Sequence, residues 1–213
     1  LRCFEDDDIT HVENRIDPLA DAEVVETELM LSDMESLERR IATVEKKAKG
    51  GDKDAKAQLA VMEKALLPLR DGRPARFADI APEERAIFTG LQLITSKPVL
   101  YVCNVDEASA ATGNAHSAKV AERAQAEGAA SVVISAKIES EFSGLPAEDR
   151  AEFLESMGLS EPGLDRLIRA GYRLLDLVTY FTVGPKEARA WTIVRGTKAP
   201  QAAGVIHTDF EKG

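Results

Sequence analysis

The 213-residue chain carries 27 Lys and Arg against 37 Asp and Glu, a net charge of −10, and is 44% hydrophobic. This composition is typical of a globular protein with one or two cores, and no apolar run reaches the ~18 residues that a membrane-spanning helix requires. The acidic net charge argues against broad electrostatic binding to naked nucleic acid, but it does not exclude a local basic patch. With two cysteines, Cys3 and Cys103, the sequence predicts no disulfide framework and favours the reducing cytoplasm.

Both ends of the chain lie close to predicted structural elements. Residues 1–4 resemble the end of a strand, and Gly213 follows a segment in which no element is finished. Because natural chains usually begin and end in surface segments, we expect a fragment that is truncated at both ends.

Between residues 20 and 69, apolar side chains recur every three or four positions in two stripes. The break at residues 50–52 predicts an antiparallel, coiled-coil-like helical hairpin, with Asp52 as N-cap of the second helix. The stripes favour a hairpin core over a ligand site. Their members are Met30, Met34, Leu37, Ile41, Val44 and Ala48 in the first stripe, and Ala55, Leu59, Met62, Leu66 and Leu69 in the second.

A strand–helix–strand unit is predicted after a further helix over residues 83–94. The apolar runs at 99–103 and 131–134 fit strands buried on both faces, and a helix over 115–128 connects them. Such a unit implies a parallel α/β sheet, whose functional loops lie at the carboxyl ends of the strands.

The predicted secondary structure of the C-terminal third changes from helices to strands along the sequence. Residues 146–176 predict short helices that are broken at Gly158 and at Pro162-Gly163. From residue 177 onward, the runs 179–183 and 190–194 flank a Gly184-Pro185 turn and predict a β-hairpin. We expect this hairpin to open a separate small domain.

Polar residues follow both predicted parallel strands and suggest a pocket that reads a base. Asn104 can tie neighbouring loops together and bind a purine edge, and an acidic residue three positions later, Glu107, can accept hydrogen bonds from base N–H groups. From the other side, the loop Ser135-Ala136-Lys137 offers a backbone N–H to the base. Together the two loops resemble the fourth and fifth motifs of P-loop GTPases, whereas each alone would fit an ordinary capped loop.

The first of these motifs departs from the GTPase form, which is usually Asn-Lys-x-Asp. Val105 stands where a Lys normally lies over guanine, and Glu107 is one methylene longer than the usual Asp. The longer side chain would then misplace the paired hydrogen bonds to guanine N1 and N2. Buried donors of the base left without a partner discriminate strongly against guanine. Guanine specificity is therefore not expected.

Several longer segments resemble the YchF (also called EngD or Ola) subfamily of Obg-like P-loop NTPases, and the resemblance covers the whole chain in order. These segments are RCFEDDDITHV at 2–12, TELML at 27–31, KPVLYVCNVDE at 97–107, AWTI at 190–193 and GTKAPQAAGVIHTDF at 196–210.

The resemblance implies a GTPase-like NTPase domain over residues 1–28 and 73–175. A coiled-coil insertion over 29–72 and a partial TGS domain, a ubiquitin-like β-grasp module, over 176–213 complete the implied organisation. It also implies a cytoplasmic ATPase that prefers ATP over GTP, uses Mg²⁺ and associates with the ribosome, expected at the large subunit. The base pocket would then comprise Asn104, Val105, Glu107, Ser135, Ala136 and Lys137.

The phosphate-binding loop of this family, Gly-x-x-x-x-Gly-Lys-Ser/Thr, does not occur in the 213 residues, and neither does its Asp-x-x-Gly motif. Because that loop carries most of the phosphate interaction, we expect this chain alone to be inactive and to hold no Mg²⁺.

An alternative from another class is a non-catalytic module that docks on the ribosome, RNA or a protein. Five lysines near the expected hairpin tip suit an RNA contact, although they also suit a merely soluble tip: Lys46, Lys47, Lys49, Lys53 and Lys56. Catalysis by His11, His116 or His207 is disfavoured because they are scattered, and residues 6–8 fit a solvated acidic loop better than a metal site.

Overall fold

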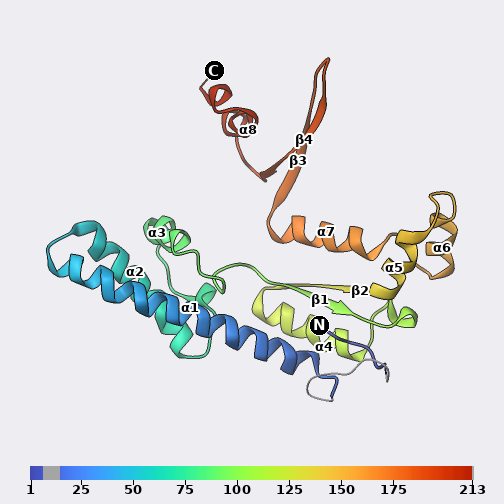
Figure 1. The fold of residues 1–213 in the computed structure, drawn as a ribbon, viewed down its shortest axis with the longest axis horizontal. Coiled ribbons are helices and arrows are strands. Elements are labelled where there is room, and N and C mark those ends of the chain that lie inside the picture. The colour runs from blue at the N-terminus through green and yellow to red at the C-terminus, as the bar shows by residue number, and fades with distance from the viewer. Residues whose placement is uncertain (7–14, 213) are drawn as a thin grey trace. The chain divides into compact units, whose positions relative to one another are not determined.

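A computed structural model describes residues 1–6 and 15–212 of the chain (Figure 1). The chain forms two compact units. One comprises Leu1–Ile16 together with Val99–Gly213, and the other comprises Asp17–Pro98. Across the described residues, no helix has both the length and the apolar character that crossing a membrane requires.

The unit Asp17–Pro98 is built on two antiparallel helices, α1 (Pro18–Lys49) and α2 (Lys53–Arg70), which lie side by side in Figure 1. As predicted, Asp52 caps α2, since its Oδ1 accepts a hydrogen bond from Ala55 N at 3.0 Å. The apolar stripes form the core between the helices, which confirms the structural interpretation of the stripes. The buried members of this core include Leu37, Val61, Met62, Ala65 and Leu66.

The compact unit Asp17–Pro98 spans more of the sequence than the insertion expected over residues 29–72. The segment after α2 contains two 3₁₀ turns, η1 (Ala75–Phe77) and η2 (Pro82–Glu84), and the short helix α3 (Arg85–Gly90). It packs back on the helix pair, because Leu91 and Leu93 are buried in the same core. The helix α1 also begins well before residue 29, and its N-cap Asp17 accepts a hydrogen bond from Ala20 N at 3.1 Å.

The helix predicted over residues 83–94 is wrong beyond Gly90. Its α-helical part ends at Gly90, and Gln92 takes a left-handed conformation with φ of 59°. A left-handed residue interrupts the helical path. Leu91 and Leu93, on either side of Gln92, are both buried in the core. In a regular helix, side chains two positions apart would point to different faces.

In the other unit, the predicted strand–helix–strand arrangement is confirmed. Strands β1 (Leu100–Asn104) and β2 (Ala130–Ile134) pair in parallel, and α4 (Ala115–Glu127) connects them. Arg2 forms a parallel bridge to Asn104 on the other side of β1. Side chains of β1 alternate between buried and half-buried, and those of β2 are mostly half-buried, so the expected burial on both faces is not observed.

Three helices follow β2: α5 (Ala136–Gly144), α6 (Arg150–Ser156) and α7 (Gly163–Leu174). They are separated near Gly158 and at Pro162-Gly163, as predicted. The predicted hairpin is also present, with β3 (Leu177–Val183) antiparallel to β4 (Ala188–Val194). After it come α8 (Ala199–Ile206) and the 3₁₀ turn η4 (Thr208–Glu211). The hairpin falls in the same compact unit as β1 and β2, and the separate small domain stays a prediction.

Candidate functional site

The two polar loops singled out in the sequence meet at one edge of the parallel pair. Asn104 and Ile134 are register partners at the carboxyl ends of β1 and β2. Asn104 Oδ1 accepts a hydrogen bond from Ala136 N at 2.8 Å, and Val105 N donates to Ile134 O at 2.9 Å. These bonds join the loop after β1 directly to the loop after β2.

An ion pair forms a second link between the same loops. Lys137 Nζ contacts Glu107 Oε1, and both side chains are partly open to solvent. The hydrogen bond and charge of Lys137 hold the pKa of Glu107 below its ordinary value of 4.5. Reciprocally, Glu107 raises the pKa of Lys137 above 10.5. The carboxylate that would face a base is therefore ionised and already paired.

The remaining two predicted residues lie inward. Val105 is buried, so its side chain packs in the interior, and its backbone N–H is the donor to Ile134 O described above. Ser135 is 1% exposed, and among the described residues its Oγ has no hydrogen-bond partner. An unpaired hydroxyl in a buried position is costly and marks a place where a polar partner would be accommodated.

Glu139, which no sequence motif singled out, links helices α5 and α7. Glu139 on α5 accepts hydrogen bonds from Gly163 N at 2.6 Å and Leu164 N at 3.1 Å, the first two residues of α7. A Cβ on Gly163 would come within 2.8 Å of Glu139 Oε1 and 3.1 Å of Ile134 Cγ2. The carboxylate thereby supplies the N-terminal cap that Pro162 cannot.

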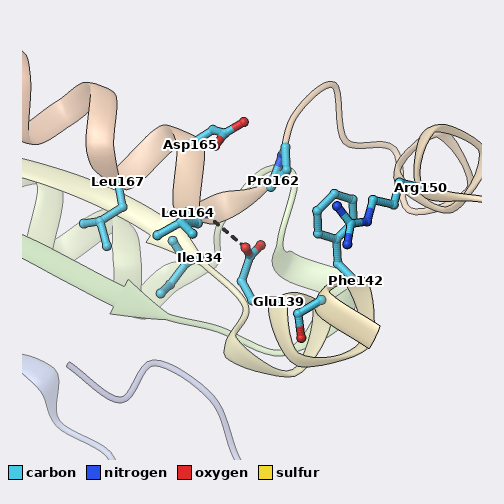
Figure 2. A pocket seen from close by; sticks show the side chains of 9 residues that line it. Ile134, Glu139, Phe142, Arg150, Pro162, Leu164, Asp165 and Leu167 are labelled. Atoms are coloured by element: carbon cyan, nitrogen blue, oxygen red, sulfur yellow. Dashed lines mark hydrogen bonds between the residues drawn. The ribbon is translucent and has the colours of Figure 1, made fainter. Parts of the chain in front are cut away.

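A pocket of about 370 Å³ lies among the end of β2, α5, α6 and α7 (Figure 2). Its walls are largely apolar, and the guanidinium of Arg150 lies over the Phe142 ring at 5.2 Å. None of the six residues predicted for the base site lines it. The lining residues are Ile134, Glu139, Phe142, Ser143, Arg150, Pro162, Leu164, Asp165 and Leu167. They share no spacing in the sequence that would have revealed the pocket.

The five lysines of the predicted contact lie around the turn between α1 and α2, and all five are exposed. Lys49 pairs with Glu45 at 2.7 Å within α1. We call this set, Lys46, Lys47, Lys49, Lys53 and Lys56, the lysine tip.

The other sequence candidates do not form a site in the described part of the chain. His11, Asp7 and Asp8 lie outside the described residues. His207 Nδ1 accepts a hydrogen bond from Asp209 N at 3.2 Å, a local contact within the C-terminal segment. Residues 1–6 and 15–212 contain no group of three or more His, Cys, Asp or Glu side chains that could hold a metal ion.

Comparison with known proteins identifies relatives along the entire chain. The chain is 51% identical over 213 residues to the "Ribosome-binding ATPase YchF" of Escherichia coli O157:H7, and 47% identical over 215 residues to that of Bacillus subtilis. It is 42% identical over 218 residues to "Obg-like ATPase 1" of the rat. Each match covers 100% of this chain but only 58%, 59% and 55% of the respective relative.

A solved structure and a family profile agree with these matches. The "Structure of the Schizosaccharomyces pombe YchF GTPase" matches with a TM-score of 0.82 and 34% identity, over 99% of this chain and 58% of that one. The profile YchF-GTPase_C, described as a protein of unknown function (DUF933), matches residues 177–213. The resemblance to YchF proteins is thus confirmed, and the chain has the α/β fold of their solved structure.

Proposed function

We propose that this chain forms the base-binding part of a YchF-type P-loop NTPase, which binds and hydrolyses ATP in preference to GTP at the ribosome. The observation that carries the proposal is the hydrogen bond from Ala136 N to Asn104 Oδ1, which assembles the two loops expected to hold the base. The homology along the whole chain to proteins named ribosome-binding ATPases supports it.

In this proposal, phosphate recognition comes from residues outside the 213. The phosphate-binding motif does not occur in the sequence, and the relatives are longer than the chain. Residues of such a loop would hold the phosphates, and Mg²⁺ would neutralise their charge. On this proposal the chain alone leaves ATP intact, because its sequence lacks the phosphate-binding motif.

The finer organisation also belongs to the proposal. Residues 1–28 and 73–175 contribute to the NTPase domain, residues 29–72 form its coiled-coil insertion, and residues 176–213 form part of a TGS domain. The protein acts in the cytoplasm, where ribosomes are found.

Two exposed features are proposed to contact the ribosome, at its large subunit. The lysine tip offers clustered positive charge for RNA phosphates in an otherwise acidic chain. On the β3–β4 hairpin, Phe181 is 74% and Val183 is 83% exposed, an apolar surface suited to a protein contact.

The same two features support the alternative, a docking module that ignores nucleotide. Sedimentation of the full-length protein with ribosomes, with and without ATP, separates the two functions. The NTPase proposal predicts that ATP changes the bound fraction and that the full-length protein hydrolyses ATP. Equal binding in both conditions, with no hydrolysis, would favour the docking module.

A further inference from the structure

We infer that the pocket among the end of β2, α5, α6 and α7 is a docking site for a basic peptide segment of a partner protein, which inserts one large apolar side chain. This surface differs from the lysine tip and from the β3–β4 hairpin, and it lies outside the nucleotide site, so the inference goes beyond the proposed function. Three features of the molecule carry it: the apolar walls of the pocket, the negative charge around it, and a cation that one wall already holds.

The inner surface of the pocket is apolar and comes from three elements. Ile134 lies at the end of β2, and Leu164 and Leu167 line the pocket from α7 (Figure 2). Phe142 of α5 adds an aromatic wall. Leu164 is 56% exposed although it lines the pocket, so apolar surface continues to the rim. The volume of about 370 Å³ gives room for a large apolar side chain, and such buried anchors dominate the affinity of many interfaces.

Two polar side chains of the pocket wall already have hydrogen-bond partners. Both oxygens of Glu139 accept hydrogen bonds from the first turn of α7. The hydroxyl of Ser143 donates to Ser140 O at 2.8 Å within α5. An apolar side chain that enters beside Glu139 and Ser143 therefore leaves none of these bonds broken, which removes the main cost of burying polar atoms.

The stretch that forms α5, α6 and their connections is strongly acidic. Residues 138–162 contain seven Asp and Glu but one Arg, so they carry −6 of the net charge of −10. The carboxylate of Asp165 adds to this charge at the rim (Figure 2). Such a field attracts a basic segment and repels the phosphates of nucleic acid. Five of the acidic side chains are exposed and form no ion pair within the described part of the chain: Glu141, Glu148, Asp149, Glu152 and Glu155.

The aromatic wall already holds one cation. The guanidinium of Arg150 lies over the Phe142 ring at 5.2 Å, and Arg150 Nε donates to Leu145 O at 3.1 Å. An aromatic face attracts Lys and Arg side chains within this range. Arg150 occupies one such position from within the chain, and the charge around it stays negative. Basic residues on either side of an apolar anchor would therefore find favourable positions.

The combination of pocket and charge distinguishes a basic peptide from other occupants. Attraction between exposed charges is weak and is screened by salt, so the acidic rim alone would not fix a partner in place. The apolar anchor supplies affinity and position, and the charges supply attraction and orientation. An RNA would meet charge of its own sign, and an uncharged apolar ligand would make no use of the rim.

The test measures the Kd of the full-length protein for a fluorescent synthetic peptide in which lysines and arginines flank one tryptophan, by fluorescence anisotropy. Two companion peptides carry serine in place of the tryptophan, or glutamine in place of every basic residue. We expect each replacement to weaken binding about tenfold or more, and added salt to weaken binding of the first peptide. Equal binding of the three peptides, or no binding of the first, would overturn the inference.

A matched pair of variants on α7 locates the anchor. Leu164→Ser removes part of the apolar wall and should weaken binding of the tryptophan peptide about tenfold, while binding of the serine peptide stays unchanged. Ile168→Ser is the control, because Ile168 lies on the same helix and is 50% exposed but does not line the pocket. Equal losses in the two variants would place the anchor elsewhere and overturn the inference.

Neutral substitutions test the acidic rim. Glu141→Gln combined with Asp165→Asn should weaken binding of the tryptophan peptide about threefold and reduce its dependence on salt. Glu63→Gln combined with Glu122→Gln removes the same charge from exposed positions on α2 and α4, and should change neither quantity. A control pair that matches the rim pair would show that net charge alone attracts the peptide, and would overturn the inference.

Filling the pocket keeps the test decisive if Leu164→Ser does not fold. Ser143→Trp places an aromatic side chain at an exposed position of the pocket wall and should abolish the advantage of the tryptophan peptide, whereas Ser140→Trp, on the same helix but outside the pocket, should not. Unchanged binding in Ser143→Trp would overturn the inference. Self-association of the wild-type protein that Ser143→Trp abolishes would assign the pocket to a second copy, and competition by an RNA oligonucleotide would assign it to nucleic acid; either result would also overturn it.

Discussion

Asp33 Oδ2 accepts hydrogen bonds from both the backbone N–H and the hydroxyl of Thr95, each at 2.7 Å. Asp33 lies in the middle of α1 and is 3% exposed, and its Oδ1 also accepts from Ile94 N at 2.9 Å. One buried carboxylate thus satisfies three donors from a segment about sixty residues away in sequence. This arrangement ties residues 91–98 to the helix pair and explains why the compact unit extends to Pro98.

Replacing this carboxylate should destabilise the helical unit strongly. Asp33→Ala leaves three buried donors without a partner, and we expect the free energy of unfolding to fall by about 3–5 kcal/mol. Chemical denaturation measures the change. Glu35→Ala, at an exposed position of the same helix, should stay within about 0.5 kcal/mol of wild type. Equal effects of the two variants would contradict the role of Asp33.

The contact between α5 and α7 predicts opposite effects at two glycines. Gly163→Ala forces a Cβ against Glu139 Oε1 and Ile134, and should destabilise the protein by about 1–3 kcal/mol. Gly171→Ala, within α7 and with open space around it, should instead stabilise by up to about 1 kcal/mol. Thermal unfolding of the two variants provides the comparison. A neutral Gly163→Ala would show that α7 does not need this close approach.

The ion pair between Glu107 and Lys137 predicts a defined pH window. The pKa of Glu107 is lowered, so its contribution is present above pH 4.5 and is lost as the pH falls further. The pKa of Lys137 is raised, so its contribution is present below pH 10.5 and is lost as the pH rises further. The difference in Tm between wild type and Lys137→Met should therefore be constant between these limits and shrink outside them.

A matched control for that experiment is Lys119→Met, at an exposed position on α4. It should show no such window. A Lys137→Met difference that varies with pH near neutrality would contradict the pairing of Glu107 with Lys137.

Reversing the charge of the lysine tip should weaken ribosome binding. Lys46→Glu, Lys47→Glu and Lys49→Glu together replace attraction to phosphates by repulsion, and we expect cosedimentation affinity to fall by about tenfold or more at moderate salt. The control pair Lys97→Glu and Lys119→Glu changes exposed lysines outside both proposed contacts. Unchanged binding by the tip variant, or an equal loss in the control, would remove the tip from the interface.

The local elements that were predicted correctly are those with strong short-range signals. The Asp52 cap, the helix-core stripes and the apolar runs of β1 and β2 each depend on neighbouring residues in sequence. The motif at residues 104–107 and its partner loop could likewise be placed together, because parallel strands bring their carboxyl ends to one edge.

The parts that the sequence did not reveal depend on contacts between distant segments. Asp33 looks like an ordinary polar residue on a helix until the fold brings Thr95 to it. The helix expected over 83–94 stops because burial of Leu91 and Leu93 outweighs helical propensity. Glu139 lies on α5 but caps α7, and no residue pattern or spacing in the sequence predicts this contact.

The most direct test of the account is competition between ATP and GTP for hydrolysis by the full-length protein, with both at equal concentration and Mg²⁺ present. We predict that ATP is hydrolysed faster, and that the 213-residue chain alone hydrolyses neither. Faster hydrolysis of GTP would contradict the assignment of residues 104–107 and 135–137 as an adenine-selective site.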